Sequence, residues 1–150
     1  MMKDPMVDVP EHSFAGREHR EMSKAVDRMH ETACMVGSVS ADELTRAVQH
    51  TLDWASGSLE PHMGWEESWL FPEIDRIADT PWATRMLRFE HQQIRQRTNR
   101  LRADQRLLHH EPDHHQVLEL RCQLFGLEAV IRAHLEREEA VLFPLLDGER

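Results

Sequence analysis

The sequence predicts an all-α protein that folds as an antiparallel up-down-up-down four-helix bundle. Three observations favour this fold class. No run of alternating Val, Ile and Thr residues bounded by turn residues is present. Four segments instead repeat apolar residues at intervals of three and four, which is the spacing of one buried helix face. The connections between these segments are short, so consecutive helices are expected to pack side by side in opposite directions.

Capping signals bound the first two helices. The first helix is expected over residues 15–36, before Gly37, because glycine readily takes the left-handed conformation that ends a helix. The second helix is expected over residues 40–72. Its start matches a capping box, in which the Ser40 side chain accepts from the first turn and Glu43 reaches back.

The last two helices also begin at recognisable residues. The third is expected over residues 80–108, starting at a Thr-Pro pair. The fourth is expected over residues 113–144, with Asp113 as its N-cap and Gln116 three residues later. A kink is expected near Pro61 in the second helix, because proline removes a backbone donor inside a helix.

Size and charge limit the possible classes of function. The 150 residues suit one domain, expected over residues 15–147 after an N-terminal arm at residues 1–14. The net charge of −9 and the scattered Lys and Arg residues argue against nucleic acid as a partner.

No apolar run has the length of a signal peptide or a membrane span, so we expect a cytoplasmic protein without a membrane partner. Cys34 and Cys122 are expected to be small buried thiols in a reducing compartment.

The first helix pair is related to the second by a constant shift in residue number, which is 72 for every motif compared. Three motifs recur at this shift: Glu18-His19 as Glu90-His91, His62-x-x-x-Glu66-Glu67 as His134-x-x-x-Glu138-Glu139, and Leu70-Phe71-Pro72 as Leu142-Phe143-Pro144. Recurrence of several motifs at one fixed shift indicates an internal repeat. The chain is therefore interpreted as one helix pair written twice.

The apolar stripe of each expected helix includes one histidine, and the stripes of the second and fourth helices also include one glutamate. The six residues are His19, His62, Glu66, His91, His134 and Glu138. An unpaired carboxylate in a protein core is strongly unfavourable or becomes neutral, and no Lys or Arg shares these stripes. The pattern therefore indicates that the six side chains share cations.

The four histidines are expected at about one level of the bundle. His19 precedes a turn centred near residue 39, and His62 follows that turn at nearly the same separation along the chain. His91 and His134 stand in the same relation to a turn near residue 111. In antiparallel helices the small difference in separation corresponds to roughly 4.5 Å along the bundle axis. The six groups should therefore converge near the end of the bundle that carries the termini.

Four imidazoles and two carboxylates exceed the ligands of one tetrahedral zinc ion and suit two ions bridged by the carboxylates. Each ion would receive two nitrogens and two oxygens. One or two positions on each ion would remain for water, hydroxide, dioxygen or peroxide. Imidazole and carboxylate donors suit iron, zinc or manganese, so the donors indicate a dinuclear site without naming the metal.

At these residues the chain resembles the hemerythrin-like, or HHE cation-binding, family. The shared pattern is a histidine on the first and third helices, His-x-x-x-Glu on the second and fourth, and Leu-Phe-Pro after each. The resemblance covers about residues 15–147. It implies an up-down-up-down bundle with a non-haem di-iron centre that binds or reacts with dioxygen, peroxide or nitric oxide. Glu66 and Glu138 would bridge the two irons. The resemblance thus favours iron over zinc or manganese.

Two departures separate the chain from oxygen-carrying members of that family. Arg95 stands where those have a second histidine one turn after the third-helix ligand, and the fourth helix has His-x-x-x-Glu in place of His-x4-Asp. These departures argue against reversible oxygen carriage and favour the sensing, iron-handling or peroxide-reactive members of the family. The leading hypothesis is sensing, or the handling of oxidative and nitrosative stress, and a sensor role would need a protein partner. Two alternatives stay open: a peroxide-decomposing or iron-oxidising enzyme, and a structural zinc or manganese bundle without redox activity.

Other residues near the ligands are assigned supporting or surface roles. Trp69 is expected to form a bulky wall beside the site, where Val141 stands in the other half. Four glutamates are expected to be solvated or to support the ligands: Glu18, Glu67, Glu90 and Glu139. The remaining histidines are expected on the polar surface: His12, His30, His50, His109, His110, His114 and His115.

Overall fold

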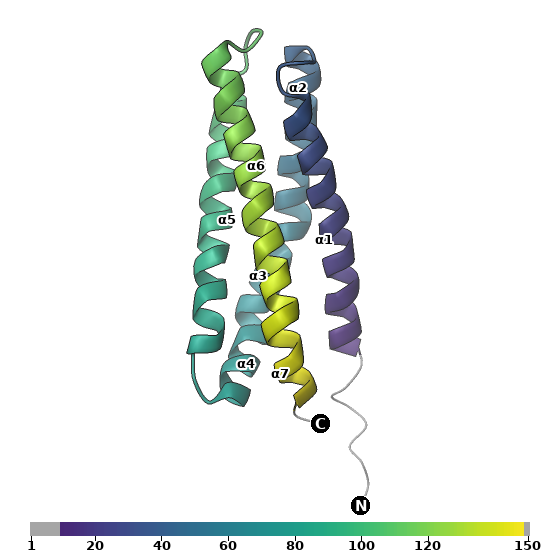
Figure 1. Cartoon of the computed structure of the whole chain (residues 1–150), viewed down its shortest axis with the longest axis vertical. Helices are drawn as coiled ribbons and strands as arrows, with labels where there is room; N and C mark the ends of the chain where they lie inside the picture. The colour runs from purple at the N-terminus through teal and green to yellow at the C-terminus, as the bar shows by residue number, and fades with distance from the viewer. Residues whose placement is uncertain (1–9, 149–150) are drawn as a thin grey trace, which may run out of the picture.

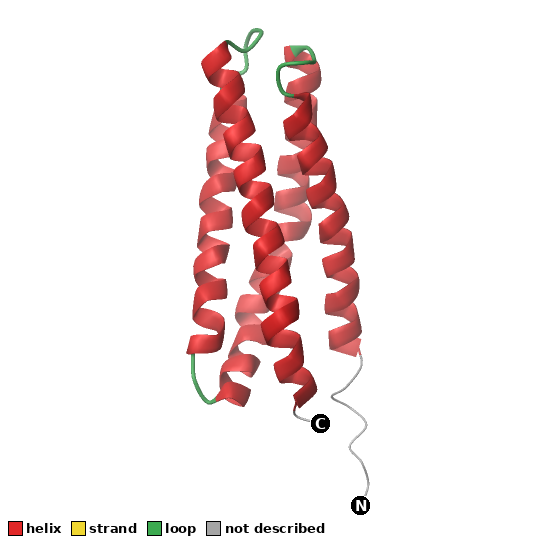
Figure 2. Ribbon diagram, viewed as in Figure 1, coloured by secondary structure: helices red, strands yellow, loops and turns green. Residues whose placement is uncertain are grey.

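The computed structural model describes residues 10–148, with side chains described over residues 16–146, and this part of the chain is helical without a strand (Figure 2). The all-α prediction is therefore confirmed. Four helical rods lie side by side (Figure 1). The first rod is α1 (Pro10–Met35) and the third is α5 (Trp82–Arg106).

The second and fourth rods are composite. The second rod consists of α2 (Ala41–Trp54), η1 (Ala55–Leu59), α3 (Glu60–Trp65), η2 (Glu66–Leu70) and α4 (Phe71–Ala78). The fourth rod consists of α6 (His114–Arg137), η3 (Glu138–Leu142) and α7 (Phe143–Gly148). The segments named η are π-helical turns, and each rod remains helical through them.

Several helix ends follow the capping signals of the sequence. Gly37 has a positive φ of 89° just after α1. The Ser40 hydroxyl accepts from the backbone N–H of Glu43 at 3.2 Å at the start of α2. Asp113 and Gln116 form a complete capping box at the start of α6, in which each side chain accepts from the other residue's backbone N–H. Local side-chain chemistry therefore sets where these helices begin and end.

The loops gather at the two ends of the rods. Loops 36–40 and 107–113 lie at one end (Figure 1), where the Glu111 carboxylate accepts from the backbone N–H of Ala41 at 3.1 Å. The start of α1 and the end of α7 lie at the other end. Since α1 begins at Pro10, the last five residues of the expected N-terminal arm are helical, and the rest of that arm lies outside the described residues.

Each π turn ends two residues before a proline: Pro61, Pro72 or Pro144. The backbone N–H of the residue before each proline bonds five positions back, to the first residue of the turn, which is Glu66 in η2 and Glu138 in η3. A proline inside a helix lacks an N–H and crowds the carbonyl four residues earlier, and a wider turn relieves both problems. A π turn therefore stands beside Pro61, where the sequence predicts a kink.

The π turns move the buried face by one residue. The sequence pattern places Trp69 and Val141 on the buried stripes, but these residues are 71% and 41% exposed. Leu70 and Leu142, one position later, are buried instead. The expectation of a Trp69 wall beside the site is therefore wrong, because a π turn holds one residue more than the α-helical period assumes.

Two apolar clusters fill the bundle on either side of one polar layer. The larger cluster runs from the 36–40 end of the bundle as far as Met63 and Leu135. The smaller cluster lies towards the termini and contains Leu70, Phe71, Ile74, Leu87 and Leu142. The candidate ligands stand between the two clusters along their helices, so apolar packing closes the polar layer from both ends.

Two expectations drawn from composition can be compared with the structure. Cys34 and Cys122 are exposed free thiols, so the expectation of buried thiols is wrong. Cys34 follows the buried Ala33, and one residue along a helix turns a side chain by about 100° away from the core. Within the described residues, no helix is both long enough and apolar enough to cross a membrane.

Candidate metal centre

The structure brings the six candidate ligands together in one buried layer. His19 lies on α1, His62 on α3, His91 on α5 and His134 on α6, while Glu66 and Glu138 begin η2 and η3. Their donor atoms form two groups, each with all members within 4.8 Å of one another: His19, His62, Glu66 and Glu138, and Glu66, His91, His134 and Glu138. Both glutamates belong to both groups.

Glu138 joins two histidines of the layer. Its Oε1 lies 2.5 Å from Nε2 of His134, four residues earlier on the same rod. Its Oε2 lies 2.9 Å from Nε2 of His19 on α1. The His-x-x-x-Glu spacing therefore places a nitrogen and an oxygen donor on one helix face, and a neighbouring helix supplies a second nitrogen.

Glu66 repeats this arrangement between the second and third rods. Its Oε1 contacts Nε2 of His62, and its Oε2 lies 3.1 Å from Nε2 of His91. The Nε2 atoms of His91 and His134 are 3.0 Å apart. The inner nitrogens and the carboxylate oxygens therefore converge on one small volume.

A ring of four further glutamates holds the outer nitrogens of the histidines. Each carboxylate accepts from Nδ1 of a histidine on a neighbouring rod: Glu18 from His62, Glu67 from His91 at 2.7 Å, Glu90 from His134 at 2.9 Å, and Glu139 from His19 at 3.3 Å. A proton fixed on Nδ1 leaves the lone pair on Nε2, pointing into the layer. The sequence pattern is compatible with either solvation or support for these four glutamates, and the structure gives them the supporting position.

The Leu-Phe-Pro motif packs directly against the ligands. The Phe71 ring stacks on His91 with 5.2 Å between ring centres, and Phe143 packs on His19 at the same separation. The leucine before each phenylalanine is buried in the smaller apolar cluster, and the proline after it accompanies the π turn that starts at the shared glutamate. The motif therefore closes the polar layer on the side of the termini.

The donor set fits metal ions. His62 Nε2, Glu66 Oε1 and both carboxylate oxygens of Glu138 are buried and make no hydrogen bond of normal geometry, although each lies close to another donor of the layer. The inner nitrogens of His91 and His134 also face each other at 3.0 Å, where two lone pairs would repel. Buried polar atoms are nearly always paired, so such a group marks a place that cations would neutralise.

Perturbed pKa values show how protons balance the charge of these groups. Burial alone lowers the pKa of His62, but the nearby carboxylates of Glu66 and Glu18 raise it to about 9. Burial also lowers the pKa of His134, but the carboxylates of Glu138 and Glu66 raise it to about 9. Burial raises the pKa of Glu66, but contacts with Glu138 and His134 hold it well below its usual range. Metal binding would therefore displace protons from imidazoles.

Two arginines that the sequence pattern does not assign to the site contact the ring of glutamates. Arg95 donates from Nη1 to Glu67 at 2.8 Å, and Arg137 contacts Glu90. Both arginines break the 72-residue repeat, because Ser23 and Trp65 stand at the equivalent positions of the first helix pair. This difference is the sequence feature that could have identified them.

The other histidines lie away from the layer. His30 is exposed and pairs with Glu128 on α6 at 2.8 Å, which confirms its assignment as a polar surface residue. Among the described residues, His, Cys, Asp and Glu donors meet within reach of one ion only in the two groups above, so the histidines at 109–115 form no such group. The side chain of His12 lies outside the described part.

Residues 15–147 match the family model for the hemerythrin HHE cation binding domain. No curated protein and no solved structure matches the chain. The matched residues include all six candidate ligands and the ring of glutamates around them.

Proposed function

We propose that this chain, which belongs to the hemerythrin HHE cation-binding family, holds two iron ions in the buried layer and binds a small ligand there. The ligand would be dioxygen, peroxide or nitric oxide, and the role would be sensing or the handling of oxidative and nitrosative stress. The observation that carries the proposal is that the two donor groups share Glu66 and Glu138. Two shared carboxylates suit a pair of neighbouring ions.

The chain's own residues would hold and orient the iron pair. Each ion would receive two imidazole nitrogens and an oxygen from each shared glutamate. The ring of glutamates would keep the imidazoles in the tautomer that binds metal. Iron with open positions can exchange electrons with a small oxygen or nitrogen species, and this is the chemistry that the bound ions would supply.

The proposal includes the arrangement of the rods, which we take to be antiparallel, with two helix pairs related by the 72-residue repeat. Contacts that recur at the repeat distance support this arrangement. Phe71 packs on His91 as Phe143 packs on His19, and the glutamates beside the ligands recur in the same crossed pattern. The positions of loops 36–40 and 107–113 at one end of the rods are also consistent with it (Figure 1).

The preference for iron over zinc or manganese rests on the family resemblance. The nitrogen and oxygen donors, without a thiolate, suit all three metals, and four donors per ion would complete a tetrahedral zinc site. A metal that takes five or six ligands would keep one or two positions open. A structural zinc or manganese bundle remains the contrasting result that the experiment below would reveal.

The second candidate is a peroxide-decomposing or iron-oxidising activity at the same centre. One observation favours it, a groove of about 690 Å³ that borders His62 and Glu18 between α1 and α3. This groove gives small molecules a path from solvent to one edge of the centre. An enzyme that turns over peroxide needs such a path more than a protein that holds its ligand in equilibrium.

Anaerobic purification with quantification of bound metal tests the proposal. Absorption spectra are then recorded before and after addition of dioxygen, peroxide or nitric oxide. Two irons per chain and a change of the visible bands are expected, and sustained gas evolution from peroxide would select the enzyme. Two zinc or manganese ions without an optical response would contradict both iron-based functions.

A further inference from the structure

The centre has two halves with equal ligands and unequal surroundings. We call His91 and His134, with their supporting Glu67 and Glu90, the arginine-supported half. The groove-side half is the counterpart under the 72-residue shift, with ligands His19 and His62 and supporting residues Glu139 and Glu18. Glu66 and Glu138 belong to both halves.

In the arginine-supported half, each supporting carboxylate pairs with an arginine. Arg95 donates two bonds to Glu67, from Nη1 at 2.8 Å and from Nη2 at 3.2 Å, and its Nε donates to Glu60 at 2.8 Å. Two parallel bonds fix the plane of a carboxylate as well as its position. Arg137 contacts Glu90, which is only 13% exposed.

In the groove-side half, the equivalent positions lack these cations. One repeat earlier in the chain, Ser23 stands in the place of Arg95 and Trp65 in the place of Arg137. Glu139 is 54% exposed and its bond to His19 is the longest of the ring, at 3.3 Å. Within residues 16–146, no Lys or Arg side chain pairs with Glu18 or Glu139.

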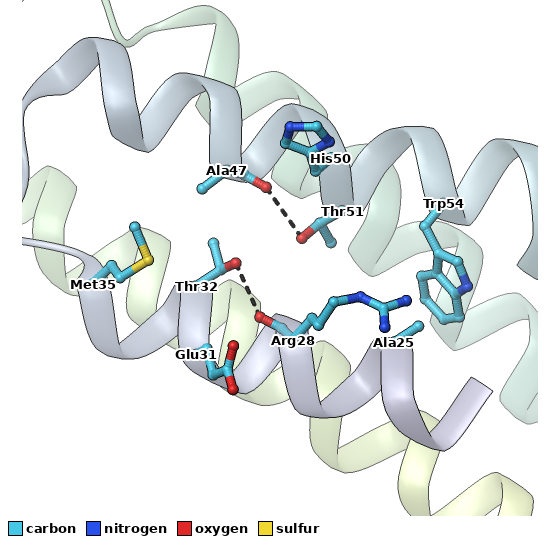
Figure 3. Close-up of a pocket in the computed structure, with 9 residues that line it drawn as sticks. All are labelled: Ala25, Arg28, Glu31, Thr32, Met35, Ala47, His50, Thr51 and Trp54. Atoms are coloured by element: carbon cyan, nitrogen blue, oxygen red, sulfur yellow. Dashed lines mark hydrogen bonds between the residues drawn. The ribbon is translucent and has the colours of Figure 1, made fainter. Parts of the chain in front are cut away.

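The groove-side half also lies against an open groove. Glu18, Pro61 and His62 line its wall, in the cavity of about 690 Å³. A second cavity of about 270 Å³ continues it between α1 and α2, and the two share Arg28 and Trp54. Figure 3 shows the Arg28 side chain running between the two helices towards Trp54. Water and ions can therefore approach this half along the side of the bundle.

We propose that the two metal positions differ in affinity, an inference that rests on the proposed dinuclear site. The position in the arginine-supported half fills first and retains its ion, whereas the groove-side position fills second and exchanges its ion with solvent. Arg95 and Arg137 are positioning residues that act through the supporting glutamates.

Two effects oppose each other here, and their sizes decide the order. The unneutralised charges of Glu18 and Glu139 attract a cation to the groove-side half, but water borders them and reduces this attraction to a factor of a few. Removing the group bonded behind a metal-binding histidine costs roughly 10–100-fold in affinity, and an arginine that orders this group should account for about the lower end of that range. The ordered half should therefore bind more tightly.

Titration of metal-free protein with Co²⁺, followed by calorimetry and visible absorption under anaerobic conditions, tests this proposal. The wild type should bind two ions in two resolved steps, and a chelator should remove the second ion first. Two equivalent steps would overturn the inequality while leaving the dinuclear site intact. Binding of no ion would instead contradict the proposed function itself.

Substitutions connect the two steps to the two halves. Arg95→Met should weaken the first step by about 10-fold and leave the second unchanged, and Arg95→Lys should restore part of the loss. Arg132→Met is the matched control, because Arg132 makes similar pairs with Asp27 and Glu128 away from the ligands and its loss should move neither step. An unchanged first step in Arg95→Met, or an equal loss in the control, would overturn the role of Arg95.

A gain-of-function variant makes the test independent of damage to the fold. Ser23 lies four residues after His19, as Arg95 lies four residues after His91, and the acceptor Glu139 corresponds to Glu67. Ser23→Arg should therefore strengthen the second step and slow loss of the second ion to a chelator. A second step that is unchanged or weaker in this variant would contradict the proposal.

Discussion

The arginine-supported half and the groove-side half differ in what lies behind their ligands, while the ligands themselves match. Each half presents two histidines to the same pair of glutamates, and each histidine donates to a further glutamate on a neighbouring rod. One half then fixes these supports with arginines, and the other leaves them beside solvent and a groove. The comparison teaches that two groups with equal donors can stand in unequal surroundings.

The largest effect is expected where the two halves meet. Glu66→Ala removes a donor from both halves, so we expect loss of both ions and of about 3–5 kcal/mol of stability in the loaded protein, since breaking a buried charged network leaves unpaired groups and metal-binding energy is lost from folding. Metal content and thermal unfolding, with and without chelator, provide the measurement. A Glu66→Ala protein with its full iron content would rule out the shared role of this carboxylate.

Single substitutions that remove one histidine from either half distinguish the two metal positions. His62→Ala should keep one tightly held ion per chain, in the arginine-supported half. His134→Ala should keep only the weakly held position and lose nearly all metal on gel filtration. Metal analysis before and after the column distinguishes the two variants. Equal retention would show that both halves hold their ions alike.

The π turns give a smaller test, and it applies equally to both halves. Leu70→Ala should cost about 2–4 kcal/mol because it opens a cavity in the smaller apolar cluster, whereas the exposed Trp69→Ala should change stability by about 0.5 kcal/mol or less. The pair Leu142→Ala and Val141→Ala should show the same contrast. Chemical denaturation measures the change in stability. A larger loss from Trp69→Ala than from Leu70→Ala would indicate that Trp69 is the buried residue, as the α-helical period predicts.

The response to pH should also be common to both halves, because each contains one histidine with a pKa raised to about 9. A folded pKa above the unfolded value of 6.5 stabilises the metal-free protein fully below pH 6.5, and this stability is lost as the pH rises through about 9. We expect a loss on the order of 3 kcal/mol for each histidine. The loaded protein should instead lose stability in acid, where protons displace metal. Denaturation of both forms between pH 5 and pH 10 should give opposite slopes, and parallel slopes would contradict this assignment.

Much of the layer could be predicted from the sequence because its signals are periodic. Apolar residues at helical spacing indicate the rods, and the constant repeat shift indicates which histidines and glutamates belong together. Counting residues from the turns places the histidines at about one level, and the structure brings His19, His62, His91 and His134 into one layer. These inferences need only the rise of a helix and the direction of its side chains.

The rest depends on features that periodicity does not contain. The register after Glu66 and Glu138 changes because a π turn adds a residue, and a fixed helical period therefore assigns Trp69 to the wrong face. The supporting bonds join different rods and depend on how those rods are rotated. Arg95 stands out only as a departure from the family pattern and from the repeat, and nothing in its own neighbourhood marks it as a partner of Glu67.

X-ray absorption spectroscopy of the iron-loaded protein measures the bridged pair most directly. Two irons that share Glu66 and Glu138 should give iron-to-iron scattering at about 3.5–4 Å, together with imidazole scattering from about two ligands per iron. The iron-to-iron signal should disappear in Glu66→Ala. A single iron per chain, or two irons without mutual scattering, would contradict a dinuclear centre in this bundle.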